Sequence, residues 1–146
     1  REVTEDLLEP LTWEMWQMAQ DISARDWLML NTTTQAFMRN VIASVHHYDA
    51  IITPVLNKPP VKIGELDTRE GMTAFAKSAQ FTSFTAAINL SGQPAVSLPM
   101  GLDQAGLPLS IQLIGRPADE STLFSLCGQL EQSRPWADLR PPLATA

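Results

Sequence analysis

Two short apolar segments in the second half of the chain are each bounded by turn-forming residues. Residues 95–98 (Ala-Val-Ser-Leu) end at Pro99, and residues 109–114 (Leu-Ser-Ile-Gln-Leu-Ile) end at Gly115. Apolar runs of this length with β-branched side chains predict buried strands. The connection over 101–108 contains glycine, aspartate and proline, which suits a hairpin-like turn. The sequence therefore predicts two neighbouring strands that other elements have to cover.

Helical patterns and a further strand precede this pair. Ser23 and Asp26 have the spacing of a capping box, which begins a long helix that we expect to end near His47. Residues at helical spacing mark its buried stripe: Phe37, Val41, Ile42, Val45 and Tyr48. After this helix, residues 50–53 (Ala-Ile-Ile-Thr) predict a third strand, which Pro54 ends.

Two more helices complete the expected set of elements. The pattern over 71–90 is helical, and Gly92 ends it as a left-handed cap. Asp119 is expected to cap the last helix. Helices that flank a few apolar strands imply an α/β layered fold. Because three strands make a narrow sheet with an open edge, we expect partner strands to be missing from this chain.

The composition is that of a globular chain. Its 146 residues are 45% apolar, which is enough for one core. A formal net charge of −6 without a cluster of Lys or Arg gives no reason to expect nucleic-acid binding. The apolar stretches are too short to cross a membrane. A single cysteine, Cys127, excludes an intramolecular disulfide and fits a cytoplasmic location.

Five ordered motifs resemble the C-terminal part of the amidase signature family. They are residues 48–54 (YDAIITP), 89–101 (NLSGQPAVSLPMG), 106–116 (GLPLSIQLIGR), Asp119-Glu120 with Leu123, and Trp136 with Arg140-Pro141-Pro142. Their order and spacing match over about residues 26–142. The segment 8–13 (LEPLTW) is similar to the branch that includes cyclic-amide-dimer hydrolases. The resemblance implies a partial amidase-type α/β/α layered fold, with a mixed sheet core flanked by helices.

The same resemblance implies the organisation of the chain. Residues 1–146 would form a single C-terminal fragment of an amidase domain. Within it, residues 1–22 are expected to form a helical arm, and residues 135–146 an irregular tail that contains several prolines. The partners implied are the rest of the amidase domain and a small-molecule amide substrate.

The central motif contains residues whose types suit a turn between a helix and a strand. Gly92 can adopt a positive φ where the chain turns sharply. Pro94 and Pro99 bracket the strand at positions where no ladder N–H is needed, and the Asn89 amide can bond backbone groups at the turn. We interpret Asn89, Gly92, Pro94 and Pro99 as structural, in preference to direct substrate contact.

The catalytic residues of the family have no counterpart here. Family members use a Ser nucleophile, a bridging Ser and a Lys, which lie in a Gly/Ser-rich stretch upstream of the matched region. This chain contains no Ser-Ser pair and no Gly-Gly-Ser run, and its lysines (Lys58, Lys62 and Lys77) lie in other contexts. We therefore assign no catalytic residue, because a nucleophile needs a base and oxyanion donors.

Other candidate sites are weak. His46 and His47 are adjacent, so their side chains point in different directions, and neither Cys nor spaced acids accompany them. We expect no metal and no cofactor. Cys127 lies on the apolar face of a predicted helix and is interpreted as a buried, unreactive thiol.

One substrate-binding hypothesis remains. In the family, the helix before the Asn89 motif and the loop after the Thr-Pro pair wall the acyl side of the substrate pocket. Carried over to this chain, Phe81, Thr82 and Thr85 would face the substrate, and Thr53 would lie near the base of the loop. The alternative interpretation is helix packing and capping, because hydroxyl side chains on a half-buried helix often bond the backbone.

The favoured functional hypothesis is part of an amidase that hydrolyses a carboxylic amide through a Ser-Ser-Lys mechanism located outside this chain. The chain alone is then expected to be inactive. One alternative is a non-catalytic binding or assembly module that self-associates through exposed sheet edges, for example as a homodimer. Another is a protein similar to the catalytic subunit of a tRNA-dependent amidotransferase, although segment 8–13 and Thr82 lean away from it.

Overall fold

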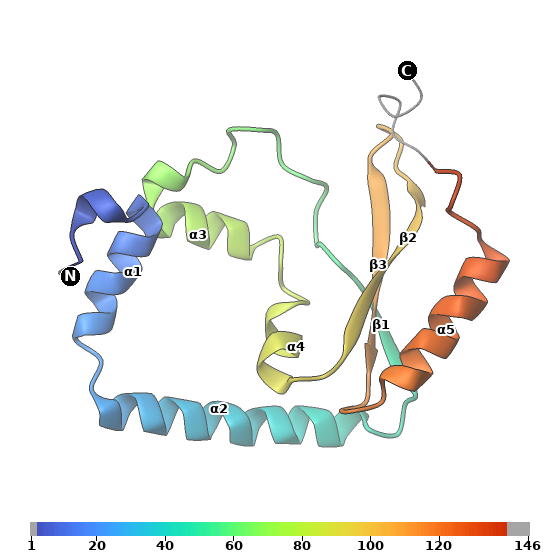
Figure 1. Cartoon of the computed structure of the whole chain (residues 1–146), viewed down its shortest axis with the longest axis horizontal. Helices are drawn as coiled ribbons and strands as arrows, with labels where there is room; N and C mark the ends of the chain where they lie inside the picture. The colour runs from blue at the N-terminus through green and yellow to red at the C-terminus, as the bar shows by residue number, and fades with distance from the viewer. Residues whose placement is uncertain (1–2, 140–146) are drawn as a thin grey trace.

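The computed structural model describes residues 3–139 of the chain. Its elements, in chain order, are η1 (Glu5–Leu7), α1 (Pro10–Gln20), α2 (Ala24–Val45), β1 (Ala50–Pro54), η2 (Thr68–Glu70), α3 (Met72–Ala79), α4 (Ala86–Ser91), β2 (Ala95–Leu102), β3 (Pro108–Gly115) and α5 (Glu120–Ser133) (Figure 1). The Arg140-Pro141-Pro142 motif and the last seven residues of the expected tail lie outside the described residues.

The sheet has three strands in the order β1-β3-β2, and both pairings are antiparallel. The α/β class and the hairpin are therefore confirmed. The mixed pairing that we expected is not formed by the three described strands. The reason for the β2–β3 pairing is that its five-residue connection is too short for the crossover that parallel strands require.

Strand β2 is longer than the sequence predicted, because Pro99 does not end it. Pro99 lies opposite Ser110, and the register shifts between Pro99 and Gly101 before pairing resumes up to Leu102. A proline without an N–H is tolerated there because β2 is an edge strand and the bulge relieves the ladder.

The core lies on the face of the sheet that α5 covers. Leu98 of β2, Leu113 of β3 and Leu123 of α5 are buried together, and half-buried residues including Cys127 and Trp136 pack against them. The predicted cap of α5 is confirmed, since the Asp119 side chain accepts hydrogen bonds from the Thr122 N–H and hydroxyl.

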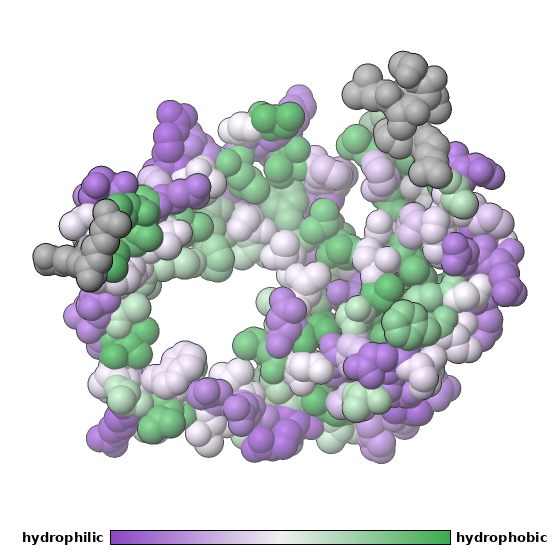
Figure 2. Space-filling model, in the orientation of Figure 1, coloured by the Kyte–Doolittle hydropathy of each residue, from purple (hydrophilic) through white to green (hydrophobic). Residues whose placement is uncertain are grey.

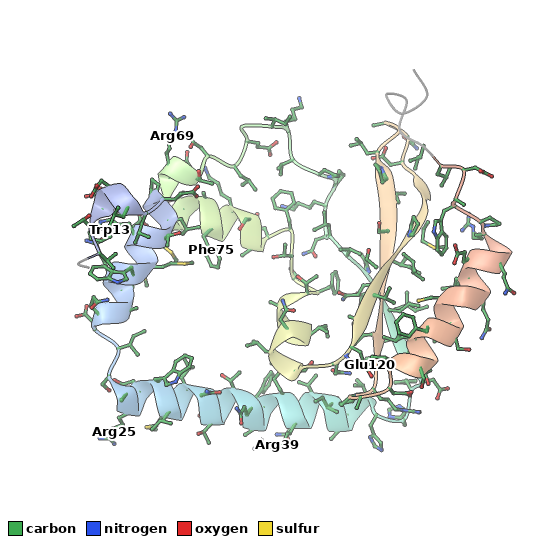
Figure 3. All side chains as sticks on the ribbon, in the orientation of Figure 1. Trp13, Arg25, Arg39, Arg69, Phe75 and Glu120 are labelled. Carbon is green, nitrogen blue, oxygen red and sulfur yellow. The ribbon has the colours of Figure 1, made fainter. Side chains whose placement is uncertain are left out.

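Helix α2 begins at the predicted cap. The Ser23 Oγ accepts from the Asp26 N–H at 3.1 Å. The expected return bond to the Ser23 backbone is replaced, because the Ser23 hydroxyl itself donates to the Asp26 carboxylate at 2.5 Å. Arg25 and Arg39 project from the side of α2 that faces away from the other elements (Figure 3).

The predicted stripe of α2 is only half correct. Val41, Ile42 and Val45 are half-buried, but Phe37 and Tyr48 are 60% and 56% exposed, and the buried residue of the helix is Met38. The reason is that α2 packs mainly against the short helix α4, which leaves much of its length uncovered. Four consecutive apolar side chains near its start are more than half exposed: Trp27, Leu28, Met29 and Leu30.

The single helix predicted over 71–90 is wrong, because the structure has α3 and α4 with a turn over 80–85 between them. The backbone carbonyl of Gln80 and that of Phe81 accept hydrogen bonds from Asn57 at 3.1 and 3.0 Å. These carbonyls are thereby diverted from continuing the helix. Gly71 is not a helix residue but the N-cap of α3.

The elements enclose an opening rather than a filled interior. Figure 2 shows this opening between α1, α2, α3 and α4, with apolar side chains on part of its border. No helix within residues 3–139 has the length and apolar content to cross a membrane.

Candidate functional site

Two strands place a hydroxyl and an amide side by side on the face of the sheet opposite α5. Thr53 of β1 pairs with Gln112 of β3. The Gln112 Nε2 donates to the Thr53 Oγ1 at 3.2 Å and to the Phe84 carbonyl at 3.4 Å. Only 7% of Gln112 is exposed. A buried amide has to be hydrogen-bonded, so Gln112 ties the turn over 80–85 to the sheet.

The loop after β1 is tied to the same turn. Asn57 donates from its backbone N–H to the Phe81 carbonyl and from its Nδ2 to the Ser83 Oγ at 2.5 Å. Lys58 donates to the Gln80 Oε1 at 3.3 Å, and its Nζ lies 5.3 Å from the centre of the Phe81 ring. The loop and the turn therefore form one connected surface.

The structure brings the four predicted substrate-binding residues into this region. Thr53, Phe81 and Thr85 are half-buried and Thr82 is exposed. The Thr85 hydroxyl donates to the Thr82 carbonyl at 3.2 Å. This bond also suits the alternative interpretation of helix capping, so substrate binding stays a prediction. We use the name pocket wall for Thr53, Asn57, Phe81, Thr82, Thr85 and Gln112.

Two members of the pocket wall were missed in the sequence. Gln112 is a polar residue within an apolar strand, and this signal was sufficient to single it out. Asn57 has no such signal, because its partners lie more than twenty residues away in a turn that was predicted as helix.

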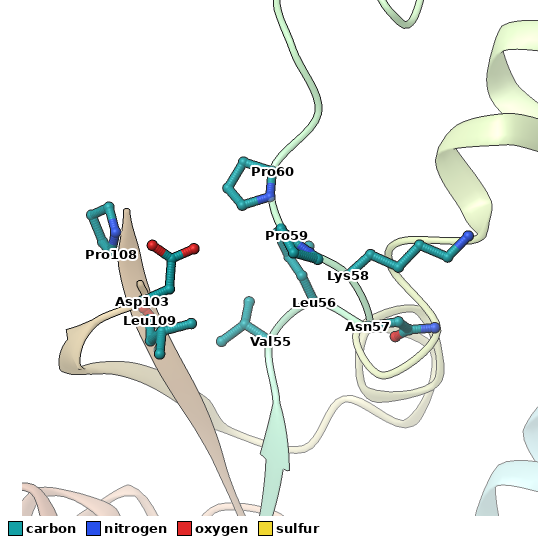
Figure 4. A pocket seen from close by; sticks show the side chains of 10 residues that line it. Val55, Leu56, Asn57, Lys58, Pro59, Pro60, Asp103, Pro108 and Leu109 are labelled. Atoms are coloured by element: carbon teal, nitrogen blue, oxygen red, sulfur yellow. The ribbon is translucent and has the colours of Figure 1, made fainter. Parts of the chain in front are cut away.

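A cleft of about 350 Å³ lies on the other side of the same loop, between residues 55–60 and the tip of the β2–β3 hairpin. Its lining is mostly apolar and includes Val55, Pro60, Pro108 and Leu109 (Figure 4). Asp103 also lines it, but its carboxylate accepts from the backbone N–H groups of residues 105 and 107 at 2.8 Å each. Asn57 and Lys58 point away from the hairpin (Figure 4).

The four motif residues interpreted as structural lie around the connection from α4 to β2. Gly92 has φ +70° and caps α4 in the left-handed conformation, as predicted. Pro94 accepts a hydrogen bond at its carbonyl from the Gly115 N–H at 2.9 Å. Asn89 is exposed, and among residues 3–139 its side chain makes no hydrogen bond.

Gln93 holds this connection in place of Asn89. Its side chain is buried, and the Nε2 donates to the Gly115 carbonyl at 2.8 Å. The Ser91 hydroxyl donates to the Gln93 Oε1 at 3.2 Å. The buried amide thus joins the end of α4 to the end of β3.

The hydrogen bonds of the serines contain no activated nucleophile. Within residues 3–139, each serine side chain that hydrogen-bonds does so with a backbone carbonyl or N–H, with Asn or Gln, or with a carboxylate. None is paired with Lys or His in that range. The described residues also bring no three His, Cys, Asp or Glu side chains together as a metal site. The pocket wall can position a ligand, but it has no group prepared for covalent attack.

Two carboxyl groups have lowered pKa values, and both are structural caps. The Arg69 guanidinium and then the Arg69 backbone N–H lower the pKa of Asp67 to about 2. The Thr122 hydroxyl lowers the pKa of Asp119. Asp67 caps η2 and Asp119 caps α5, so neither belongs to the pocket wall.

Comparison with known proteins identifies the family. The profile of the Amidase family matches residues 1–124. The chain therefore belongs to the amidase (amidase signature) family.

Two relatives and one solved structure illustrate the similarity. The 6-aminohexanoate-cyclic-dimer hydrolase of Paenarthrobacter ureafaciens is 32% identical over 98% of this chain. A solved structure of a 6-aminohexanoate cyclic dimer hydrolase superimposes with a TM-score of 0.89 over 99% of this chain and is 32% identical. A glutamyl-tRNA(Gln) amidotransferase of Thermodesulfovibrio yellowstonii contributes a subunit that is 39% identical over 65% of this chain. The chain spans only 31% of the length of the hydrolase relative and 19% of that of the amidotransferase relative.

Proposed function

We propose that this chain is the C-terminal, non-catalytic part of an amide hydrolase, and that it supplies one wall of the substrate pocket. The observation that carries the proposal is the connection of Thr53, Gln112 and the turn over 80–85 into one polar surface. The serine nucleophile, the bridging serine and the lysine would belong to the remaining part of the domain. The protein would act on C–N bonds other than peptide bonds.

The chemistry of the pocket wall suits one role in such a reaction. Its hydroxyl and amide groups can hydrogen-bond the carbonyl and N–H of an amide substrate. The half-buried Phe81 ring gives an apolar surface for the chain that follows the carbonyl. Attack on the carbonyl would form an acyl-enzyme, which water then hydrolyses. The wall would orient the acyl part during both steps.

A chimera tests this proposal. In the hydrolase of Paenarthrobacter ureafaciens, the segment aligned with this chain is replaced by the chain itself. We expect the chimera to hydrolyse the 6-aminohexanoate cyclic dimer or a simple carboxylic amide, whereas the 146-residue chain alone shows no turnover. Turnover by the isolated chain at an enzyme-like rate would contradict the proposal, and so would a folded chimera inactive on every amide tried.

Substitutions in the chimera test the four predicted contacts. Phe81→Ala, Thr53→Val, Thr82→Val and Thr85→Val should raise KM by roughly 2- to 10-fold, the loss that one removed contact or hydrogen bond brings. The matched control is Thr12→Val, an exposed threonine of α1 outside the pocket wall. Unchanged kcat/KM in all four variants would favour the capping interpretation.

The second candidate function is a role as part of the catalytic subunit of a tRNA-dependent amidotransferase. The 39% identity to the Thermodesulfovibrio yellowstonii protein exceeds the identity to the hydrolase, although over a shorter segment. Grafting this chain into the amidotransferase gives the discriminating comparison. Activity restored in the amidotransferase but absent in the hydrolase chimera would favour this second function.

We also propose a cytoplasmic location, supported by a single cysteine, Cys127, that packs against the core without a disulfide partner in the sequence. The remaining alternative is self-association through sheet edges. Light scattering at high protein concentration tests it, because a homodimer doubles the mass.

A further inference from the structure

The two edges of the sheet differ in how well they are protected. Strand β2 has Pro99 within it and a bulge before Gly101, and both features discourage pairing with another strand. Strand β1 has neither, because its register against β3 is continuous from Ala50 to Pro54. Natural edge strands are blunted by such features, so β1 has the character of an interior strand.

The backbone of β1 has unused hydrogen-bonding groups. In an antiparallel pair, alternate residues direct their N–H and C=O groups away from the partner. Among residues 3–139, the backbone of residues 50–54 makes hydrogen bonds only with β3. The side chain of Ile52 is 65% exposed although its neighbour across the ladder, Leu113, is the most deeply buried side chain of the core.

A groove of about 670 Å³ runs beside β1 on the face that α5 covers. Its floor includes Ile52 and Leu113, and α5 forms one side with Leu126 and Leu130. The α5 helix packs over β3 and β2 rather than over β1. The groove therefore stays open toward the free edge of β1, where apolar surface is left in contact with water.

We propose that the free edge of β1 pairs with a fourth strand from the remaining part of the amidase domain. This inference rests on the proposed function. Apolar residues at alternate positions of the added strand would lie beside Ile52 at the usual cross-strand distance of about 5 Å and close the groove. The solved hydrolase with the same fold over this chain is about three times longer, so two-thirds of such a chain is available to supply the strand.

Hydrogen exchange tests this pairing directly. The amides of residues 50–54 are compared in the isolated chain and in the hydrolase chimera described above. We expect the outward-facing amides to exchange at least about tenfold more slowly in the chimera, because pairing places them within the stable sheet. The amides bonded to β3 give an internal control, since they are paired in both proteins.

A pair of matched substitutions gives a second readout. Ile52→Lys should abolish the added protection in the chimera, while leaving the circular dichroism of the isolated chain unchanged because Ile52 is exposed there. Leu102→Lys is the control, since Leu102 lies on the other edge strand and is 56% exposed. It should leave the protection of residues 50–54 intact.

The outcomes separate this inference from the proposed function. An active chimera whose residues 50–54 gain no protection overturns the inference and leaves the function standing. A protected but inactive chimera supports the pairing and contradicts the function. Protection that rises with the concentration of the isolated chain, together with a doubled mass in light scattering, overturns the inference in favour of a second copy.

Discussion

The Glu14 carboxylate in α1 accepts a hydrogen bond from the Met72 backbone N–H at 2.8 Å, at the start of α3. The N-cap of α3 is Gly71, which has no side chain to satisfy the free N–H groups of the first turn. Glu14 provides this cap from a helix 58 residues earlier, and its negative charge suits the positive end of α3. The contact holds α1 and α3 together.

Removing this cap should destabilise the chain. Glu14→Ala is expected to lower the free energy of unfolding by about 1 kcal/mol, the usual cost of a lost N-cap. Gly71→Ala should cost more, because Gly71 has φ +55° and a Cβ would overlap the Glu14 carboxylate. Urea unfolding measures both. If the overlap is real, the double variant costs less than the sum of the single variants.

The buried amide of Gln93 gives a second test. Gln93→Ala should destabilise the chain by about 1–3 kcal/mol, since the Gly115 carbonyl loses its donor inside the protein. The control is Gln35→Ala on the exposed surface of α2, where a change within about 0.5 kcal/mol is expected. Equal midpoints of urea unfolding for the two variants would show that Gln93 does not hold the connection.

Two glycines with room for a Cβ should respond in opposite directions. Neither Gly92 nor Gly128 has any atom within 4 Å of an added Cβ. Gly92→Ala should lower stability by about 1–2 kcal/mol, because φ there is +70°. Gly128→Ala should raise it by roughly 0.5–1 kcal/mol, since Gly128 lies inside α5 and alanine favours the helix. Melting temperatures that shift in the same direction would contradict this pairing of effects.

The Asp67 carboxyl should titrate at low pH. Its pKa of about 2 lies below the ordinary value of 3.8, so the folded state favours the ionised form. The resulting stabilisation is complete above pH 3.8 and is lost as the pH falls through about 2. Carboxyl carbon chemical shifts followed by NMR give the pKa. Arg69→Gln should raise it toward 3.8, with the backbone N–H at position 69 still holding it lower. A wild-type midpoint near 3.8 would contradict the Asp67–Arg69 interaction.

Local signals were sufficient for several elements. Ser23 and Asp119 were recognised as caps, and Gly92 as the left-handed end of a helix, because each depends on residues within one turn. The β2–β3 hairpin was equally readable from its short connection. The exposure of Phe37 was not, because helical spacing predicts a face but not whether anything covers it.

The sequence by itself determined the elements, the family motif and the absence of the family's catalytic stretch from this chain. Only the tertiary structure decided which groups meet. The Glu14 cap, the Asn57 bonds that interrupt the helix predicted over 71–90, and the Gln112 bond to Thr53 all join residues more than twenty positions apart. Side-chain hydrogen bonds of this kind have no sequence period, since they depend on how the elements pack rather than on the local backbone.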